Sequence, residues 1–459
     1  MPQAVASCWR LYGRLRMIRS SLFRNRCESL ILSSNRFVAL RAWYPWVIWL
    51  FSTLGFLFSV AGQTMGMGVF TDYFIEVLDL TRTELSLAYL VGTLGSAACL
   101  TRAGRWFDVY GGRVVIALSS LALALVLVYI SAIDQFLTFS ESGFLLPWLL
   151  ILMGYFGVRF FGQGVLTSAS RNILLIWFLT RRGLVSGMRG IFVSLGFALA
   201  PLGLAALIAG YGWRGALWIL AAGLSVFAAA AWVCVRARPQ RSAPEGGASR
   251  ASNFNDQESE TQQIVGTSLA EAKRNPVFWL YACSLSMHAL FGTALTFHIV
   301  SIFQESGRGA DEAFAYFLPA AICSTLVNLV GGALADSRPL KPFLVAMLAA
   351  FLVGAIGLAF LTEDWGYWLL AIGFGVGGGL WGVLSNLAFV RYFGLKHLGE
   401  ISGLNTALTV SASAIGPAAF SLGLDFFDSY QMPVYVCIAG LGLLLCWALW
   451  QPSEQAPIV

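Results

Sequence analysis

Residues 104–113 read Gly104-Arg-Trp-Phe-Asp108-Val-Tyr-Gly-Gly-Arg113, and this short charged stretch lies between two long apolar runs. Its paired glycines permit a tight turn, and Gly104 permits the close approach of two helices, as small residues do in membranes. A weaker copy, Gly332-Ala-Leu-Ala-Asp336-Ser-Arg338, also separates two apolar runs. Two copies of one loop predict a chain built from two homologous halves.

The composition is that of an integral membrane protein. Hydrophobic residues make up 58% of the chain and charged residues only 11%, with a mean hydropathy of +0.73, whereas soluble domains carry roughly 25% charged residues. The net charge of +6 is therefore assigned to membrane orientation, and no nucleic-acid partner is expected. The eight cysteines show no metal-ligand spacing, so we expect free thiols, no bound metal and no cofactor.

Apolar segments of about 20 residues, the length that crosses a bilayer, recur along the whole chain. We place them near 45–71, 84–103, 113–133, 146–170, 183–209 and 214–235, and again near 277–303, 312–335, 341–361, 366–390, 399–423 and 431–450. The expected fold is all-α, with twelve transmembrane helices in two pseudo-symmetric six-helix bundles.

The polar segments divide the chain into five parts. These are a basic N-terminal tail (1–42), a first bundle (43–235), a linker (236–275), a second bundle (276–451) and a C-terminal tail (452–459). The first tail holds eight arginines and one acid, Glu28; it resembles an organellar transit peptide, but we favour a cytosolic tail. At the end of the linker, Ser268-Leu-Ala-Glu271 fits a capping box that opens a short surface helix.

The basic residues predict the orientation, because cytosolic loops carry an excess of Lys and Arg. With both termini in the cytosol, all 29 Lys and Arg except Arg82, Arg159, Arg214 and Arg308 fall in cytosolic segments or their flanks. We therefore expect a monomeric, multi-pass protein of a cell membrane, with a bacterial inner membrane as the favoured location. Both repeat loops then lie in the cytosol.

Twelve spans in a six-plus-six division and the two repeat loops together resemble the major facilitator superfamily over roughly residues 43–450. Other stretches are similar to its monocarboxylate and oxalate:formate branch, namely Gly66-Met-Gly-Val-Phe70, Thr81-Arg-Thr-Glu-Leu-Ser86 and Trp177-Phe-Leu-Thr-Arg-Arg-Gly183. Gly212-Trp-Arg214 is similar to a recurrent turn of the superfamily.

The chain also departs from that pattern. Val109 follows Asp108 where the family usually has a basic residue, and span 8, Phe314 to Leu334, has no charge. The animal monocarboxylate transporters have an Asp and an Arg in span 8 and a Lys in span 1. Their proton mechanism is therefore not carried over to this chain.

The resemblance implies a substrate site near the midplane between the bundles, lined by spans 1, 4, 7 and 10. The polar and aromatic candidates on these spans are Gln63, Arg159, Gln163, His288, His298, Trp381 and Asn386. Arg159 is the sharpest candidate, because a charge inside a span is costly and its planar fork matches a carboxylate. Gln163 shares its helical face at i+4. The alternative is a structural role for Arg159 within its bundle.

Two further groups of candidates concern coupling and gating. No acid lies deep in a span, so His288 and His298 are the expected proton carriers; the alternative is a pair of neutral, hydrogen-bonded histidines. The expected gating residues are Gly104, Asp108, Gly111, Arg113, Asp336 and Arg338. Their aspartates would act by capping helices or by pairing with Arg105, Arg113 or Arg338, and the alternative is simple turn stability.

These features predict a secondary transporter of small organic anions, monocarboxylates in the first place. It would work by alternating access, with proton coupling or anion exchange. The alternatives are an exporter of amphipathic compounds and, from another class, a non-transporting membrane receptor. The sequence contains neither a Walker motif nor a catalytic constellation, so neither ATP-driven transport nor an enzyme is expected.

Overall fold

The computed structural model describes residues 43–135, 145–178, 181–236 and 266–451. The predicted tails and the 237–265 part of the predicted linker lie outside the described residues. The chain divides into two units between Val47 and Ile48. The elements discussed below lie in the second unit, apart from the start of the span 1 helix at Trp43. The bundle boundaries at 235 and 276 stay predictions.

Ten helices of the described residues are long and apolar enough to cross a membrane. Two of these, α5 (Arg82–Ser131) and α8 (Arg182–Cys234), contain two spans each, because each helix is interrupted by one non-helical glycine. Gly111 has φ 78° and ψ 164°, and Gly212 has φ 70° and ψ 167°. Dividing both helices at these glycines gives twelve spans, so the predicted all-α, twelve-helix fold is confirmed.

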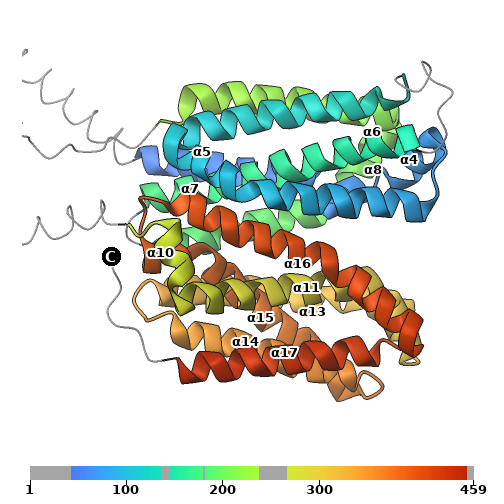
Figure 1. The fold of residues 1–459 in the computed structure, drawn as a ribbon, viewed down its shortest axis with the longest axis vertical. Coiled ribbons are helices and arrows are strands. Elements are labelled where there is room, and N and C mark those ends of the chain that lie inside the picture. The colour runs from blue at the N-terminus through green and yellow to red at the C-terminus, as the bar shows by residue number, and fades with distance from the viewer. Residues whose placement is uncertain (1–42, 136–144, 179–180, 237–265, 452–459) are drawn as a thin grey trace, which may run out of the picture. The chain divides into compact units, whose positions relative to one another are not determined.

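The remaining elements follow in chain order, from blue to red in Figure 1. In the N-terminal half they are η1 (Ser59–Gly62), α3 (Thr64–Gly68), α4 (Thr71–Leu78), α6 (Leu145–Gly157), the π-helical η3 (Val158–Leu166) and α7 (Thr167–Trp177). In the C-terminal half they are α10 (Leu269–Arg274), α11 (Pro276–Glu305), α12 (Ala310–Ala315), α13 (Phe317–Ala335), α14 (Lys341–Ala359), α15 (Asp364–Phe393), α16 (Leu398–Phe427) and α17 (Gln431–Trp450). Span 4 thus comprises α6, η3 and α7, and spans 7 to 12 are α11 and α13 to α17.

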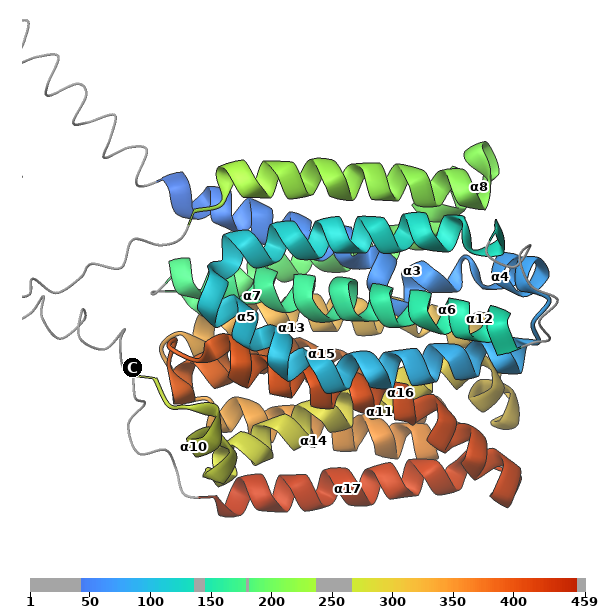
Figure 2. The same cartoon turned by 45° about the horizontal axis from the view of Figure 1, so that its top comes forward.

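Within the second unit, the blue-to-green helices and the yellow-to-red helices form two groups that lie side by side (Figures 1 and 2). The groups meet where α5 packs on α16 and α8 packs on α13. Each contact is built on a pair of glycines. A Cβ at Gly104 would lie 2.0 Å from the carbonyl oxygen of Gly399, and one at Gly183 would lie 2.0 Å from that of Gly332. The same close approach therefore occurs twice, once for each copy of the repeat loop.

The first span differs from the prediction of one continuous helix over 45–71. The helix ends in η1, and Gln63 then adopts an extended conformation, with φ −86° and ψ 155°, before α3 begins. Packing explains the break: a Cβ at Gly62 would lie 2.4 Å from the carbonyl oxygen of Val158 in η3. The break in span 1 lies against the π-helical part of span 4. Short π-helical segments within α-helices often mark functional sites.

The capping box predicted at the end of the linker is confirmed. The Ser268 hydroxyl accepts from the Glu271 backbone at 3.3 Å, and the Glu271 carboxylate accepts from the Ser268 backbone at 2.9 Å. These hydrogen bonds favour the ionised carboxylate and hold the pKa of Glu271 below its usual value. The result is α10, a six-residue helix directly before span 7.

The turn at Gly111 provides a test of the division of α5. Its backbone conformation is open to glycine and strained for other residues, yet an added Cβ would meet nothing within 4 Å. Gly111→Ala should therefore act through backbone strain alone and destabilise the protein by about 1–3 kcal/mol. The melting temperature of the purified protein in detergent measures this loss.

Gly203→Ala is the matched control, because Gly203 is helical and an added Cβ there also meets nothing within 4 Å. This variant should keep its melting temperature or raise it, because alanine is more stable than glycine in a helix interior by up to about 1 kcal/mol. Equal melting temperatures for the two variants would contradict a glycine-dependent break.

Candidate functional site

Asp108, in the first repeat loop, caps a helix of the opposite half. Its Oδ1 accepts from the backbone N–H of Gly399 at 2.7 Å, and its Oδ2 accepts from that of Glu400 at 2.8 Å. Both N–H groups belong to the first turn of α16, where they have no partner within the helix. A carboxylate there also complements the helix dipole. The N-terminal half thereby holds the start of span 11.

Asp336 makes the pseudo-equivalent contact in the reverse direction. Its Oδ1 and Oδ2 accept from the backbone N–H groups of Gly183 at 2.6 Å and Leu184 at 3.1 Å, in the first turn of α8. Of the two mechanisms predicted for these aspartates, capping is thus present in both copies. Among the described residues neither carboxylate forms an ion pair with Arg105, Arg113 or Arg338, and the Arg113 guanidinium lies 4.7 Å from the Trp232 ring centroid.

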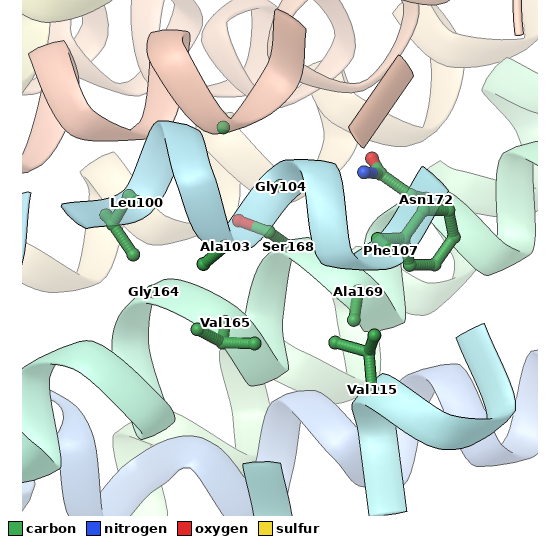
Figure 3. A pocket seen from close by; sticks show the side chains of 11 residues that line it. Leu100, Ala103, Gly104, Phe107, Val115, Gly164, Val165, Ser168, Ala169 and Asn172 are labelled. Atoms are coloured by element: carbon green, nitrogen blue, oxygen red, sulfur yellow. The ribbon is translucent and has the colours of Figure 1, made fainter. Parts of the chain in front are cut away.

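The halves are tightly packed next to the Asp108 cap. Asn172 of α7 donates to the Ser402 hydroxyl of α16 at 2.8 Å, and the hydroxyls of Ser168 and Thr406 lie 3.2 Å apart. Figure 3 shows the small cavity here, with Ser168 and Asn172 as the polar residues among those labelled. Its volume of about 10 Å³ is roughly that of one water molecule, so the halves are closed together at this end.

Arg189 joins the two halves further into the bundle. This side chain of span 5 is 4% exposed. Its Nη2 donates to Oδ1 of Asn386 in span 10 at 2.9 Å, and its Nη1 donates to the hydroxyl of Ser52 in span 1 at 3.2 Å. The guanidinium carbon lies 4.5 Å from the ring centroid of Phe56. One buried cation thus links spans 1, 5 and 10, and spans 1 and 10 are among those expected to line the central site.

Arg171 lies beside this link. It belongs to span 4 and is half-buried, and its Nη1 donates to the backbone carbonyl of Ser385 at 3.4 Å. Ser385 and Asn386 are neighbours on α15, so two guanidinium groups from different spans reach consecutive residues of span 10. Asn386 is fixed in place, because its own Nδ2 donates to the Gly382 carbonyl at 2.6 Å.

Arg159, the sharpest candidate from the sequence, lies inside the N-terminal half. It is 1% exposed, and its Nη1 donates to the Gly62 carbonyl and to the Thr64 hydroxyl, both at 3.3 Å. Its guanidinium carbon lies 5.1 Å from the ring centroid of Tyr89. Arg159 therefore holds the carbonyl that the break in span 1 leaves free. Its Nε is buried and has no hydrogen-bond partner among the described residues.

The glutamines predicted to accompany Arg159 lie at the same break. Gln63 is the extended residue itself, and its Nε2 donates to the Ser59 hydroxyl at 3.3 Å. Gln163 lies on η3 against Gly62, and its Oε1 is buried without a partner. Both are half-buried. The structure thus brings Gln63, Arg159 and Gln163 together around the opening of span 1.

His288 and Trp381 contact each other inside the C-terminal half. The His288 ring stacks on Phe351 at 4.4 Å between centroids and lies 5.2 Å from the Trp381 ring. The Nδ1 of His288 is buried without a hydrogen-bond partner, and Trp381 donates to the Leu285 carbonyl at 3.1 Å. His288 therefore lies in an aromatic environment.

His298 has a fuller set of polar partners. Its Nε2 lies 3.0 Å from the Pro417 carbonyl, and its Nδ1 lies 3.2 Å from the hydroxyl of Tyr430. The Tyr430 backbone in turn donates to the Glu305 carboxylate at 3.1 Å. These partners all belong to the C-terminal half, whereas those of Arg159 belong to the N-terminal half. The two predicted site residues are therefore not in contact.

The buried arginines differ from those at the helix ends. Arg308 pairs with Glu312 at 2.6 Å and with Asp364 at 2.9 Å, and the Glu312 carboxylate raises the pKa of Arg308. Within the described part of the chain, ion pairs to carboxylates are recorded for Arg308 and Arg214. Arg159, Arg171 and Arg189 have only neutral partners there.

Sequence reasoning missed the pair of Arg171 and Arg189 because it counted them as flanks of their spans. Arg189 lies seven residues after the start of α8 at Arg182, which is about 10 Å along a helix. Arg171 lies six residues before the end of α7. Depth counted from the helix ends would have drawn attention to both.

Comparisons with known proteins agree with this architecture. A family profile described as Major Facilitator Superfamily matches residues 52–417. No curated protein sequence matches the chain.

Three solved structures illustrate the likeness of fold. The Escherichia coli fucose:proton symporter FucP has a TM-score of 0.63 at 13% identity, over 90% of this chain and 100% of its own. A bacterial homologue of the iron transporter ferroportin, in an outward-facing state, has a TM-score of 0.67 at 15% identity, over 88% and 98%. The proton:xylose symporter XylE, bound to 6-bromo-6-deoxy-D-glucose, has a TM-score of 0.59 at 13% identity, over 91% and 98%.

The two caps can be tested as one gate. Losing a capping carboxylate costs about 1 kcal/mol, so Asp108→Ala or Asp336→Ala should raise the population open at this end about 5-fold. A cysteine replacing Ala169, which lines the cavity beside the Asp108 cap and is 1% exposed, reports the opening. Its labelling rate in detergent, followed by peptide mass, should rise similarly in both variants.

Asp364→Ala is the control, because its carboxylate belongs to the Arg308 pair. Unchanged labelling in both cap variants would exclude a gating role.

Proposed function

This chain belongs to the Major Facilitator Superfamily, and on that premise we propose that it transports small organic anions by alternating access. Membership of this superfamily makes it a multi-pass membrane transporter rather than an enzyme. The anion specificity is our proposal. Its main support is the hydrogen bond between Arg189 and Asn386, which joins the two halves. Arg189 is a buried cation that has no carboxylate partner among the described residues.

The electrostatic argument starts from the cost of such a cation. A charged side chain at the centre of a span costs about 2.5–3.5 kcal/mol on insertion scales, and a buried cation about 10 Å from a helix end carries part of this cost. Neutral acceptors such as Asn386 and Ser52 recover part of this cost, and a carboxylate would recover more, because its two oxygens match the planar fork of arginine. No acidic side chain lies mid-span among the described residues. The substrate would supply the missing negative charge.

The same geometry suggests how binding could be linked to movement. Arg189 connects span 5 to spans 1 and 10, so an anion that replaces Asn386 as its partner changes a contact between the halves. The caps at Asp108 and Asp336 close one end. We assign that end to the cytosol, from the distribution of basic residues. On this assignment the substrate enters from the outside, and the caps separate when the protein opens inward.

We assign different roles to the two arginines that face the central spans. Arg189, with Asn386 and Trp381 on span 10, would contact the anion. Arg159 would instead hold the opened backbone of span 1, since its fork is already bonded to the Gly62 carbonyl and the Thr64 hydroxyl. Gln63 and Gln163 remain candidates for further hydrogen bonds to the substrate.

Proton coupling, if present, is better placed at His298 than at His288. The Pro417 carbonyl can only accept, so Nε2 of His298 carries a hydrogen and the neutral ring accepts at Nδ1 from the hydroxyl of Tyr430. A second proton at Nδ1 would reverse that bond, so that His298 donates to the Tyr430 hydroxyl. The Nδ1 of His288 has no hydrogen-bond partner among the described residues.

The charge of the site can be cancelled with little change of shape. Asn386→Asp would place a carboxylate against Arg189 and satisfy it within the protein. The variant should keep its melting temperature and lose carboxylate counterflow in proteoliposomes. Arg189→Lys keeps the charge without the planar fork and should weaken the apparent affinity by about 10-fold or more.

Arg214→Gln is the control, because that arginine pairs with Asp134 away from the interface between the halves. It should leave counterflow unchanged. Full carboxylate counterflow in a folded Asn386→Asp variant would contradict the proposed site.

Replacement of His298 separates proton coupling from anion exchange. His298→Gln keeps a hydrogen-bonding side chain but cannot titrate, so proton-linked uptake should lose its pH dependence between about pH 5 and 8. His288→Gln serves as the comparison and should retain it. A pH dependence that survives in both variants would favour electroneutral exchange of one anion for another.

A further inference from the structure

Arg171 and Arg189 form a pair of cations at one place on span 10. Arg171 donates to the carbonyl of Ser385 at 3.4 Å, and Arg189 donates to the side chain of the next residue at 2.9 Å. These contacts bring two positive charges to consecutive residues of α15. Among the described residues, no ion pair to a carboxylate is recorded for either group.

Two like charges inside a bundle repel each other strongly, because the surroundings screen them poorly. A monoanion bound to Arg189 would neutralise one charge and leave Arg171 unbalanced. A dianion would neutralise both. The pair therefore distinguishes between two classes of anion in a way that one arginine cannot.

The hydrogen-bonding capacity of the pair leads to the same conclusion. A guanidinium carries five N–H donors; one bond is recorded for Arg171 and two for Arg189. Arg171 is half-buried and its single bond is long, so its donors are the more available. Two separate carboxylates could therefore each form a bidentate contact with one guanidinium group.

We propose that the substrate is a small dicarboxylate, with one carboxylate bound by Arg171 and the other by Arg189. The inference rests on the proposed anion transport and specifies its substrate class. It also replaces the monocarboxylate expected from the sequence with a dianion.

The test uses the purified protein in proteoliposomes and acids of matched carbon number. Malonate and succinate are compared with propionate and butyrate as counterflow substrates at pH ~7.5, where all carboxyl groups are ionised. The dicarboxylates should have apparent affinities about 10-fold or more tighter than the monocarboxylates, as one extra charge-assisted contact would give.

Arg171→Gln should abolish that selectivity. The apparent affinity for dicarboxylates should fall about 10-fold, while that for monocarboxylates should change less than about 3-fold. Arg171→Lys retains the charge without the planar fork and should therefore lose only part of the selectivity. A merely structural role for Arg171 would lower both affinities together, so the ratio is the decisive readout. Arg214→Gln again serves as the control and should leave the ratio unchanged.

The possible outcomes separate this inference from the function on which it rests. Monocarboxylates carried as well as dicarboxylates by the parent protein would overturn the dianion inference and leave anion transport standing. Transport of neither set would overturn the proposed function itself. The selectivity of the parent protein decides the matter even if Arg171→Gln does not fold.

Discussion

A guanidinium group buried among membrane-spanning helices requires either a counter-charge or a set of well-placed acceptors. Among the described residues Arg189 has neutral acceptors only, one from span 1 and one from span 10, so they come from both halves of the protein. The site, the contact between the halves and the charge of the expected substrate all depend on this one group. An acidic side chain in place of these acceptors would have neutralised Arg189 within the protein and made the contact between the halves a permanent ion pair.

The closed end of the molecule depends on a second, repeated interaction. Each repeat loop places an aspartate on the first turn of a helix in the other half, and a glycine four residues earlier allows the backbones to approach. Such caps are strong enough to hold one conformation and weak enough to separate within a transport cycle. An anion that alters the Arg189 contact would act on the same interface.

Much of the fold could be predicted from the sequence, because span length is set by the bilayer and loop polarity by water. The twelve spans and the capping box at Ser268 follow from such local rules. The break at Gln63 does not, because it depends on the fit of Gly62 against span 4. The depth of Arg189 was missed for a related reason. Its distance from the helix end was visible, but its partners, Ser52 and Asn386, lie far away in the sequence.

The site residues illustrate the same limit. Periodicity and span number placed Arg159, Gln63 and Gln163 on two spans expected to line one site, and in the structure they lie around one backbone break. Sequence could not show that Arg159 is occupied by that backbone, because a free carbonyl leaves no mark in the sequence. Nor could it show that the polar partners of His298 all lie in its own half.

Ligand-induced stabilisation of the purified protein tests the central claim most directly, because it needs no gradient and no assumed direction of transport. Melting temperatures would be compared across small carboxylates and neutral sugars at equal concentration. Our account predicts that a carboxylate stabilises the parent protein, by about 2.7 kcal/mol at one hundred times its Kd, and that Asn386→Asp removes the effect. Stabilisation by a neutral sugar, with none by any anion, would contradict it.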